Sequence, residues 1–133
     1  MDASLRRLIW RRANDTCEYC RISQSLDDLP FEIDHIIASK HRGPTIAGNL
    51  ALSCYYCNAF KGPNIAGVDS KSEKITPLFH PRHEEWIEHF EWNGPVVVGL
   101  TPTGRATIDV LRMNQPERVS LRAALIDEGV FPT

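Results

Sequence analysis

The spacing of apolar and polar residues predicts four regular elements in the first half of the chain. Apolar positions recur at helical spacing over residues 5–13, which predicts a helix. Residues 31–37 and 50–53 are rich in β-branched and aromatic side chains, which favours strands. Residues 55–61 predict a short helix, because the Gly-Pro pair that follows suits the end of a helix. A glycine-bearing loop is expected at residues 39–49. The predicted order of elements after the first helix is therefore strand, loop, strand, helix.

The second half of the chain has a less regular pattern. Residues 63–77 are polar and without period, so we expect an irregular segment wrapped over the surface. Beyond it we expect a helix at 83–89, a hairpin of 90–92 with 96–100, and helices at 103–111 and 116–129. The apolar face of the last helix is expected to be Val119, Ala123 and Ile126. The predicted class is α+β.

Length and composition describe one domain over residues 1–133. Apolar residues make up 42% of the chain, but no apolar run reaches the roughly 18 residues of a membrane span. The first residues are charged and lack the apolar core of a signal peptide, which favours a cytoplasmic location without a membrane partner. A net charge of −2 does not by itself indicate a nucleic-acid partner.

Four cysteines in two Cys-x-x-Cys pairs predict a metal site. Each pair offers two sulfurs to one ion, and thirty-three residues separate Cys20 from Cys54, enough for the chain to go out and return. The ligands would be Cys17, Cys20, Cys54 and Cys57. Four thiolates leave no open position, so a zinc ion here would be structural rather than catalytic. Two disulfides, inert buried thiols or an iron ion are the alternatives.

A second set of polar residues lies inside the same block, in the order Asp34-His35, Asn49, Asn58 and Lys61. Together with the cysteine pairs, this register over about 17–62 resembles the HNH endonuclease family. The resemblance implies a ββα-metal core (also called the His-Me finger) stabilised by a four-cysteine zinc site, flanked by the N-terminal helix and the C-terminal hairpin and helices. Within the C-terminal extension at about 63–133, the segment of residues 76–114 looks like one that accompanies small bacterial HNH proteins, and it carries no residue roles.

The resemblance also implies roles for these residues. His35 would be the general base, since its intrinsic pKa suits proton removal from water near neutral pH. Asp34 and Asn58 would hold one Mg²⁺ or Mn²⁺ ion, for which oxygen donors are the preferred ligands. Asn49 would fix the loop so that His35 keeps its orientation, and Lys61 is expected to face a phosphate.

Two features depart from the simplest form of this pattern. Adjacent residues of a regular strand point to opposite faces, so Asp34 and His35 reach one site only through a bulge, a strong twist or a strand end. The loop His41-Arg42-Gly43-Pro44 has one glycine where many members of the family have a pair.

The function implied is a metal-dependent endonuclease that cuts DNA, most simply double-stranded, into 5′-phosphate and 3′-hydroxyl ends. The alternative is a non-catalytic zinc-knuckle module that binds nucleic acid or protein, in which Asp34 and His35 serve only the structure. The pattern does not separate double-strand cutting from nicking, or DNA from RNA.

Overall fold

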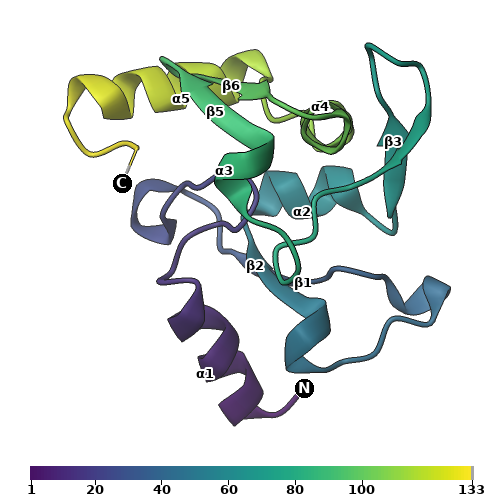
Figure 1. Ribbon diagram of the computed structural model, residues 1–133. Helices are drawn as coiled ribbons and strands as arrows, with labels where there is room; N and C mark the ends of the chain where they lie inside the picture. The colour runs from purple at the N-terminus through teal and green to yellow at the C-terminus, as the bar shows by residue number, and fades with distance from the viewer. Residues whose placement is uncertain (133) are drawn as a thin grey trace.

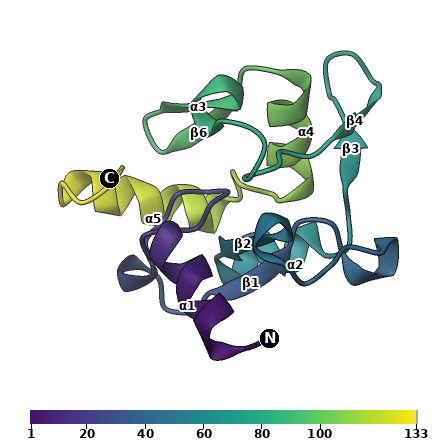
Figure 2. The ribbon, with the colours of Figure 1, turned by 60° about the horizontal axis from the view of Figure 1, so that its bottom comes forward.

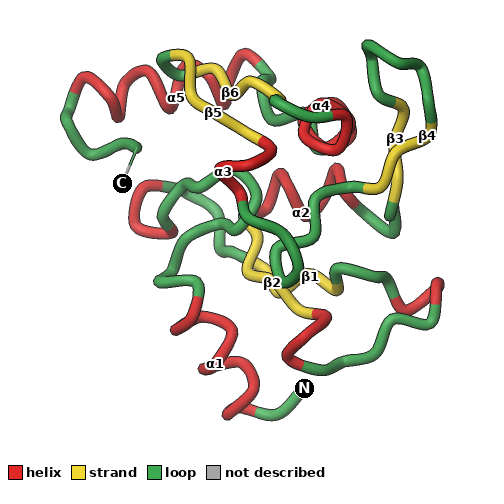
Figure 3. The backbone as a smooth tube through the Cα atoms, in the orientation of Figure 1, coloured by secondary structure: helices red, strands yellow, loops and turns green. Residues whose placement is uncertain are grey.

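A computed structural model describes residues 1–132. Helices and three two-stranded antiparallel sheets are intermixed, which confirms the α+β class (Figures 1 and 3). The elements are α1 (Ala3–Arg12), β1 (Glu32–His35), β2 (Leu50–Ser53), α2 (Tyr55–Lys61), β3 (Ala66–Val68), β4 (Ile75–Pro77), α3 (Trp86–His89), β5 (Phe90–Asn93), β6 (Val96–Gly99), α4 (Pro102–Val110) and α5 (Pro116–Asp127). None of the described helices has the length and apolar content needed to cross a membrane.

The β1–β2–α2 unit forms where the sequence predicts it. β2 and α2 have the predicted bounds, whereas β1 is shorter than the predicted strand at residues 31–37. The two strands pair without interruption, with Asp34 opposite Ala51 and His35 opposite Leu50. Gly62 follows α2 with φ +49°, a conformation that suits a residue without a Cβ atom. This unit brings the predicted site residues onto one short hairpin and one helix.

The N-terminal helix packs against β2. The carboxylate of Asp2 caps α1 by accepting a hydrogen bond from the amide of Leu5 (2.8 Å). At the other end, the guanidinium of Arg12 donates to the carbonyl oxygens of Ala47 (2.8 Å) and Leu50. The first helix is therefore tied to the loop that precedes β2.

The expectation of an irregular segment at residues 63–77 is wrong, because β3 and β4 form a hairpin there. Gly67 explains its position: a Cβ atom at this residue would lie 2.6 Å from Cγ2 of Val110 on α4. The carboxylate of Asp69 also accepts two hydrogen bonds from the Arg105 guanidinium (2.7 and 3.2 Å), which lowers the pKa of Asp69. The β3–β4 hairpin is thus held by contacts with α4, which lies far along the chain, and the residues of the hairpin alone do not predict it.

The C-terminal hairpin and helices are those expected, but the bounds of the helices differ from the predicted ones. β5 and β6 form the predicted hairpin, and α3 is shorter than the predicted helix at 83–89. α4 is capped by Thr101, whose hydroxyl accepts from the amide of Gly104 (3.0 Å), and so begins at Pro102.

The buried face of α5 differs from the prediction. It consists of Arg118, Arg122 and Leu125 in place of Val119, Ala123 and Ile126, which are half-buried. The Arg122 guanidinium donates to the carbonyl oxygens of Pro95 (2.7 Å) and Met113 (2.8 Å). The two arginines can be buried because their charged ends find partners inside the protein.

Candidate active site and metal centre

The four cysteines converge in the interior of the protein. One sulfur from each of Cys17, Cys20, Cys54 and Cys57 lies within 4.8 Å of the others, and all four residues are buried. The sulfurs of Cys20 and Cys54 are 3.7 Å apart and none of the four is in a disulfide. A tetrahedral Zn²⁺ with Zn–S bonds of ~2.3 Å needs sulfurs separated by about 3.8 Å. The donor set therefore fits a tetrahedral metal ion, and the disulfide alternative does not match the structure.

Local turns and one strand contact build this cluster. In each pair, the amide of the second cysteine donates to the sulfur of the first, at 3.4 Å for both Cys20 to Cys17 and Cys57 to Cys54. Glu18 brings the first pair to β2: its amide donates to the carbonyl oxygen of Leu52 (2.9 Å), and its carboxylate accepts from the Leu52 amide (2.8 Å). The sequence spacing of the cysteines is enough to predict the cluster but not the contact that joins its halves.

Arg118 on α5 is part of the surroundings of the cluster, and no pattern in the sequence indicates this. Its guanidinium lies 3.8 Å from the Cys54 sulfur and 3.2 Å from the carboxylate of Asp27. Burial alone would lower the pKa of Arg118, but the charges of Cys20, Cys54 and Asp27 outweigh it, so that the pKa is raised. A guanidinium from the C-terminal extension therefore keeps its positive charge beside the thiols.

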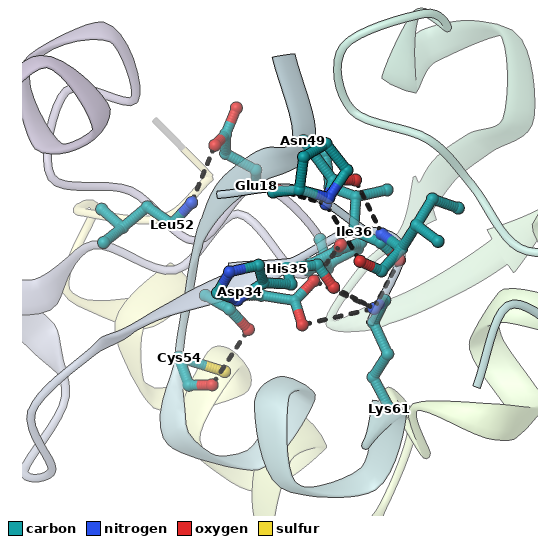
Figure 4. A network of polar contacts seen from close by, with 12 residues as sticks. Glu18, Asp34, His35, Ile36, Asn49, Leu52, Cys54 and Lys61 are labelled. Carbon is teal, nitrogen blue, oxygen red and sulfur yellow. Dashed lines mark hydrogen bonds and ion pairs between the residues drawn. The ribbon is translucent and has the colours of Figure 1, made fainter. Parts of the chain in front are cut away.

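Asp34 is a buried residue with two partners inside the protein (Figure 4). The hydroxyl of Tyr19 donates to Oδ2 (2.7 Å), and Nζ of Lys61 lies 3.1 Å from Oδ2 and 3.2 Å from Oδ1. Burial raises the pKa of Asp34, and the charge of Lys61 and the Tyr19 hydrogen bond act in the opposite direction. Any metal ion bound by Asp34 would have to share this carboxylate with Lys61 or displace it.

Lys61 does not have the surroundings expected of a residue that faces a phosphate. It is 1% exposed, and its ammonium also donates to the carbonyl oxygens of His35 (3.1 Å) and Ile36 (3.0 Å). Three acceptors for three N–H groups leave no donor for a substrate. In the structure, Lys61 joins the end of α2 to the end of β1.

His35 lies at the end of β1, next to the strand residue that carries the carboxylate. The β1–β2 register contains no bulge, and His35 is the last residue of the strand. The His35 ring is half-buried, and its Nε2 is 2.9 Å from the hydroxyl of Thr45 in the following loop. A proton on Nε2, donated to Thr45, leaves the lone pair of Nδ1 free to accept a proton.

Asn49 makes the hydrogen bonds of a residue that holds the loop. Its side-chain oxygen accepts from the amide of Ile37 (2.9 Å), and its side-chain nitrogen donates to the carbonyl oxygens of Ile37 and Pro44 (2.9 Å each). Arg42, in the same loop, has a left-handed φ of +67°. A second glycine, as in many members of the HNH family, would fit this position without strain.

Asn58 is not joined to the other site residues by side-chain contacts. It is half-buried on α2, and its side chain has no hydrogen-bond partner among residues 1–132. The structure therefore brings Asp34 together with Lys61 and the main chain of His35, and Asn49 with the loop. Tyr19, which the sequence analysis missed, completes the Asp34 network from inside the first Cys-x-x-Cys turn.

Comparison with known proteins bears on the family that the chain resembles. Residues 17–63 match the family model described as HNH endonuclease, so the predicted HNH segment is confirmed. The chain is also similar to the Septu protein PtuB of Bacillus thuringiensis, with 29% identity over 124 residues. That match covers 91% of this chain and 45% of the relative, so the chain spans less than half of that protein's length. No solved structure matches the chain.

Proposed function

We propose that this protein is a metal-dependent endonuclease that hydrolyses the phosphodiester bonds of DNA, with His35 as the general base. The observation that carries the proposal is the position of His35. It ends β1 inside the matched HNH segment, beside a loop fixed by Asn49, with one ring nitrogen held by Thr45. Removal of a proton from water by Nδ1 would generate the attacking hydroxide, and the products would carry 5′-phosphate and 3′-hydroxyl ends.

Two kinds of metal belong to this proposal. The cysteine cluster would hold a structural Zn²⁺, for which its sulfur spacing is suited. The oxygen donors of Asp34 and Asn58 suit Mg²⁺ or Mn²⁺. An ion held there would stabilise the charge that develops on the departing 3′ oxygen. Lys61 already places a positive charge at Asp34 and keeps the ends of β1 and α2 together.

The alternative, a non-catalytic zinc-knuckle binding module, is favoured by one observation. Asp34 is paired with Lys61 and Tyr19 in the interior, as expected of a carboxylate that serves only the structure. This alternative predicts that His35 can be replaced without functional consequence.

A plasmid-cleavage assay separates the two proposals. Wild-type protein, His35→Ala and His41→Ala are incubated with supercoiled DNA in Mg²⁺, in Mn²⁺ and without added divalent ion. His41 is the matched control, because it is an exposed histidine of the adjacent loop. We expect His35→Ala to lose nearly all cleavage, His41→Ala to keep it, and cut ends to be ligated without prior phosphorylation.

The metal arm of this assay uses omission of the ion rather than a chelator, because a chelator would also draw metal from the cysteines. Metal analysis of each sample verifies that the cluster remains loaded. Equal cleavage by wild type and His35→Ala, or cleavage that persists without Mg²⁺ or Mn²⁺, would contradict the proposed mechanism.

A further inference from the structure

Two segments of the chain contain basic residues and no carboxylate. Residues 3–13 hold four arginines, and residues 36–53 hold Lys40 and Arg42, while neither contains Asp or Glu. The rest of the chain has nine Lys and Arg against all seventeen Asp and Glu. The net charge of −2 thus conceals a local charge of +6 on two segments and −8 on everything else.

These two segments contact each other where the end of α1 meets the start of β2. Arg12 at the end of α1 donates to main-chain oxygens of Ala47 and Leu50, and Ile9 of the same helix is buried. In both ribbon views, α1 lies to one side of the β1–β2 pair and the loop that follows β1 extends to the other (Figures 1 and 2).

The carboxylate-free segments also border His35. On β2, the residue opposite His35 is Leu50, and Thr45 of the loop contacts its ring. His35 therefore borders the second basic segment, and Leu50 of that segment also accepts a hydrogen bond from Arg12 of the first.

The basic side chains of this region are available to a partner. Arg12 is exposed but is hydrogen-bonded to the main chain, so we call the other exposed members the basic track; they are Arg6, Arg7, Arg11, Lys40 and Arg42. Among the described residues, no member of the basic track is in an ion pair. Arg7 and Arg11 also border an open hollow of about 370 Å³ with Trp10, Asn14 and Asp15.

Folding does not account for this arrangement. Arg7 and Arg11 are four residues apart on α1, and like charges at that spacing destabilise a helix. Arg42 holds a left-handed φ of +67°, which is unfavourable for a residue with a Cβ atom. Arg11 is also favoured by its place in the last turn of α1, so the net cost is small, and a role in binding would offset it.

We infer that the basic track binds the phosphodiester backbone of duplex DNA beside the phosphate that His35 would address. A polyanion fits, because three of the cations lie on a helix roughly 15 Å long and two more lie in the loop after β1, and the charges of one DNA strand repeat about every 3.4 Å along the duplex axis. Contacts of this kind fix the position of the duplex and carry no sequence information themselves. The inference rests on the proposed function and names the substrate surface of that site.

The test measures binding separately from cleavage. Fluorescence anisotropy follows a short labelled DNA duplex at several salt concentrations without Mg²⁺ or Mn²⁺, for wild type and for Arg7→Gln/Arg11→Gln. The matched control is Lys71→Gln/Lys74→Gln, which removes the same charge from exposed positions on the β3–β4 hairpin.

The expected size of the effect follows from counterion release. Each lost phosphate contact makes the negative slope of log K against log salt shallower by about 0.9. It also lowers the affinity at ~0.1 M salt by roughly eightfold. The Arg7/Arg11 double variant should therefore lose about 1.8 in slope and roughly sixtyfold in affinity. The Lys71/Lys74 control should bind like the wild type.

Several outcomes would overturn the inference. These are unchanged binding by Arg7→Gln/Arg11→Gln, an equal loss in the hairpin control, or tighter wild-type binding to an RNA duplex of the same sequence. Wild-type protein that cleaves DNA while the Arg7/Arg11 variant binds normally overturns only this inference. Wild-type protein that neither binds nor cleaves DNA overturns the proposed function instead.

Arg42→Gly separates charge from folding. Glycine suits the observed φ, so the melting temperature should stay equal or rise, while DNA affinity at ~0.1 M salt should fall by roughly eightfold. Unchanged affinity would remove Arg42 from the basic track. Loss of affinity with retained stability would support a contact made by its charge.

Discussion

The cysteine cluster and the Asp34 network are two buried polar sites on the same short helix, and they differ in how their charge is balanced. Four thiolates around a divalent ion carry a net charge of −2, and without that ion the sulfurs would have to bind protons or leave up to four negative charges beside the Arg118 guanidinium. Asp34 instead has one cation of the protein, Lys61, at 3.1 Å, and a hydroxyl donor at 2.7 Å. The first site is suited to a metal ion that balances its charge, and the second is already balanced within the protein.

This difference separates folding from catalysis. Cys54 caps the start of α2 and Lys61 ends it, so the two sites fix opposite ends of one helix. If the charge balance is correct, removal of the cluster metal should unfold the protein. Removal of Mg²⁺ or Mn²⁺ should leave the fold intact, because Lys61 supports Asp34 without it.

The largest expected effect is that of Cys54→Ser, since serine is a poor ligand for zinc. Zinc binding to sites of this kind is worth about 10–16 kcal/mol, which equals or exceeds the stability of a typical domain. We expect metal content to fall well below one ion per chain and cooperative thermal unfolding to disappear, as measured by elemental analysis and circular dichroism. Asp34→Asn is the comparison variant and should keep its bound metal. A folded Cys54→Ser protein with no metal would show that the cluster is merely a group of buried thiols.

The next effect is that of Lys61→Met, which leaves the Asp34 carboxylate buried without its cation. Breaking a buried ion pair from one side costs about 3–5 kcal/mol of unfolding free energy. Denaturant unfolding of the variant and the wild type would measure this loss. The double variant Lys61→Met/Asp34→Asn should recover part of this loss, and Lys40→Met, at an exposed lysine, should change little. Equal unfolding free energies for Lys61→Met and Lys40→Met would contradict the assignment of Lys61 as the partner of Asp34.

The pH dependence of Lys61→Met has a definite sign. Burial raises the pKa of Asp34 and Lys61 opposes that rise, so the variant's folded-state pKa should lie further above the unfolded value. The folded variant then binds a proton more readily than the unfolded chain. Its stability deficit should therefore be full above the raised pKa and shrink as pH falls through it. A deficit that grows on acidification would refute this account of the pair.

The sequence predicted the parts of the fold that depend on local signals. β2 and α2 have their expected bounds because a run of apolar residues, a capping cysteine and the Gly62-Pro63 pair lie next to one another. The cysteine cluster follows from spacing, since each pair makes its own turn. The strand that carries His35 was predicted as well, but over residues 31–37, so its end at His35 was not.

Features that depend on distant contacts were not predicted. The β3–β4 hairpin rests on Gly67 packing against Val110, and nothing in residues 63–77 indicates that neighbour. The α5 face was misjudged because buried arginines look polar in sequence. Lys61 and Asp34 are 27 residues apart, and the direction of the lysine side chain depends on how α2 packs on β1.

The smallest of these effects is expected for Asn49→Ala, which tests whether the loop beside His35 is held by that one amide. The substitution removes three hydrogen bonds and leaves the Ile37 amide and carbonyl without their partner, at a cost of about 1–3 kcal/mol. Asn64→Ala, at an exposed position just after α2, is the matched control and should stay near wild type.

Cleavage by Asn49→Ala should fall by more than the loss of folded protein explains, because the loop carries Thr45 and thereby the orientation of the His35 ring. Metal content should not change, since the loop provides no ligand to the cysteine cluster. Full cleavage by a destabilised Asn49→Ala protein would mean that His35 is positioned by β1 alone, and that the loop serves stability rather than the reaction.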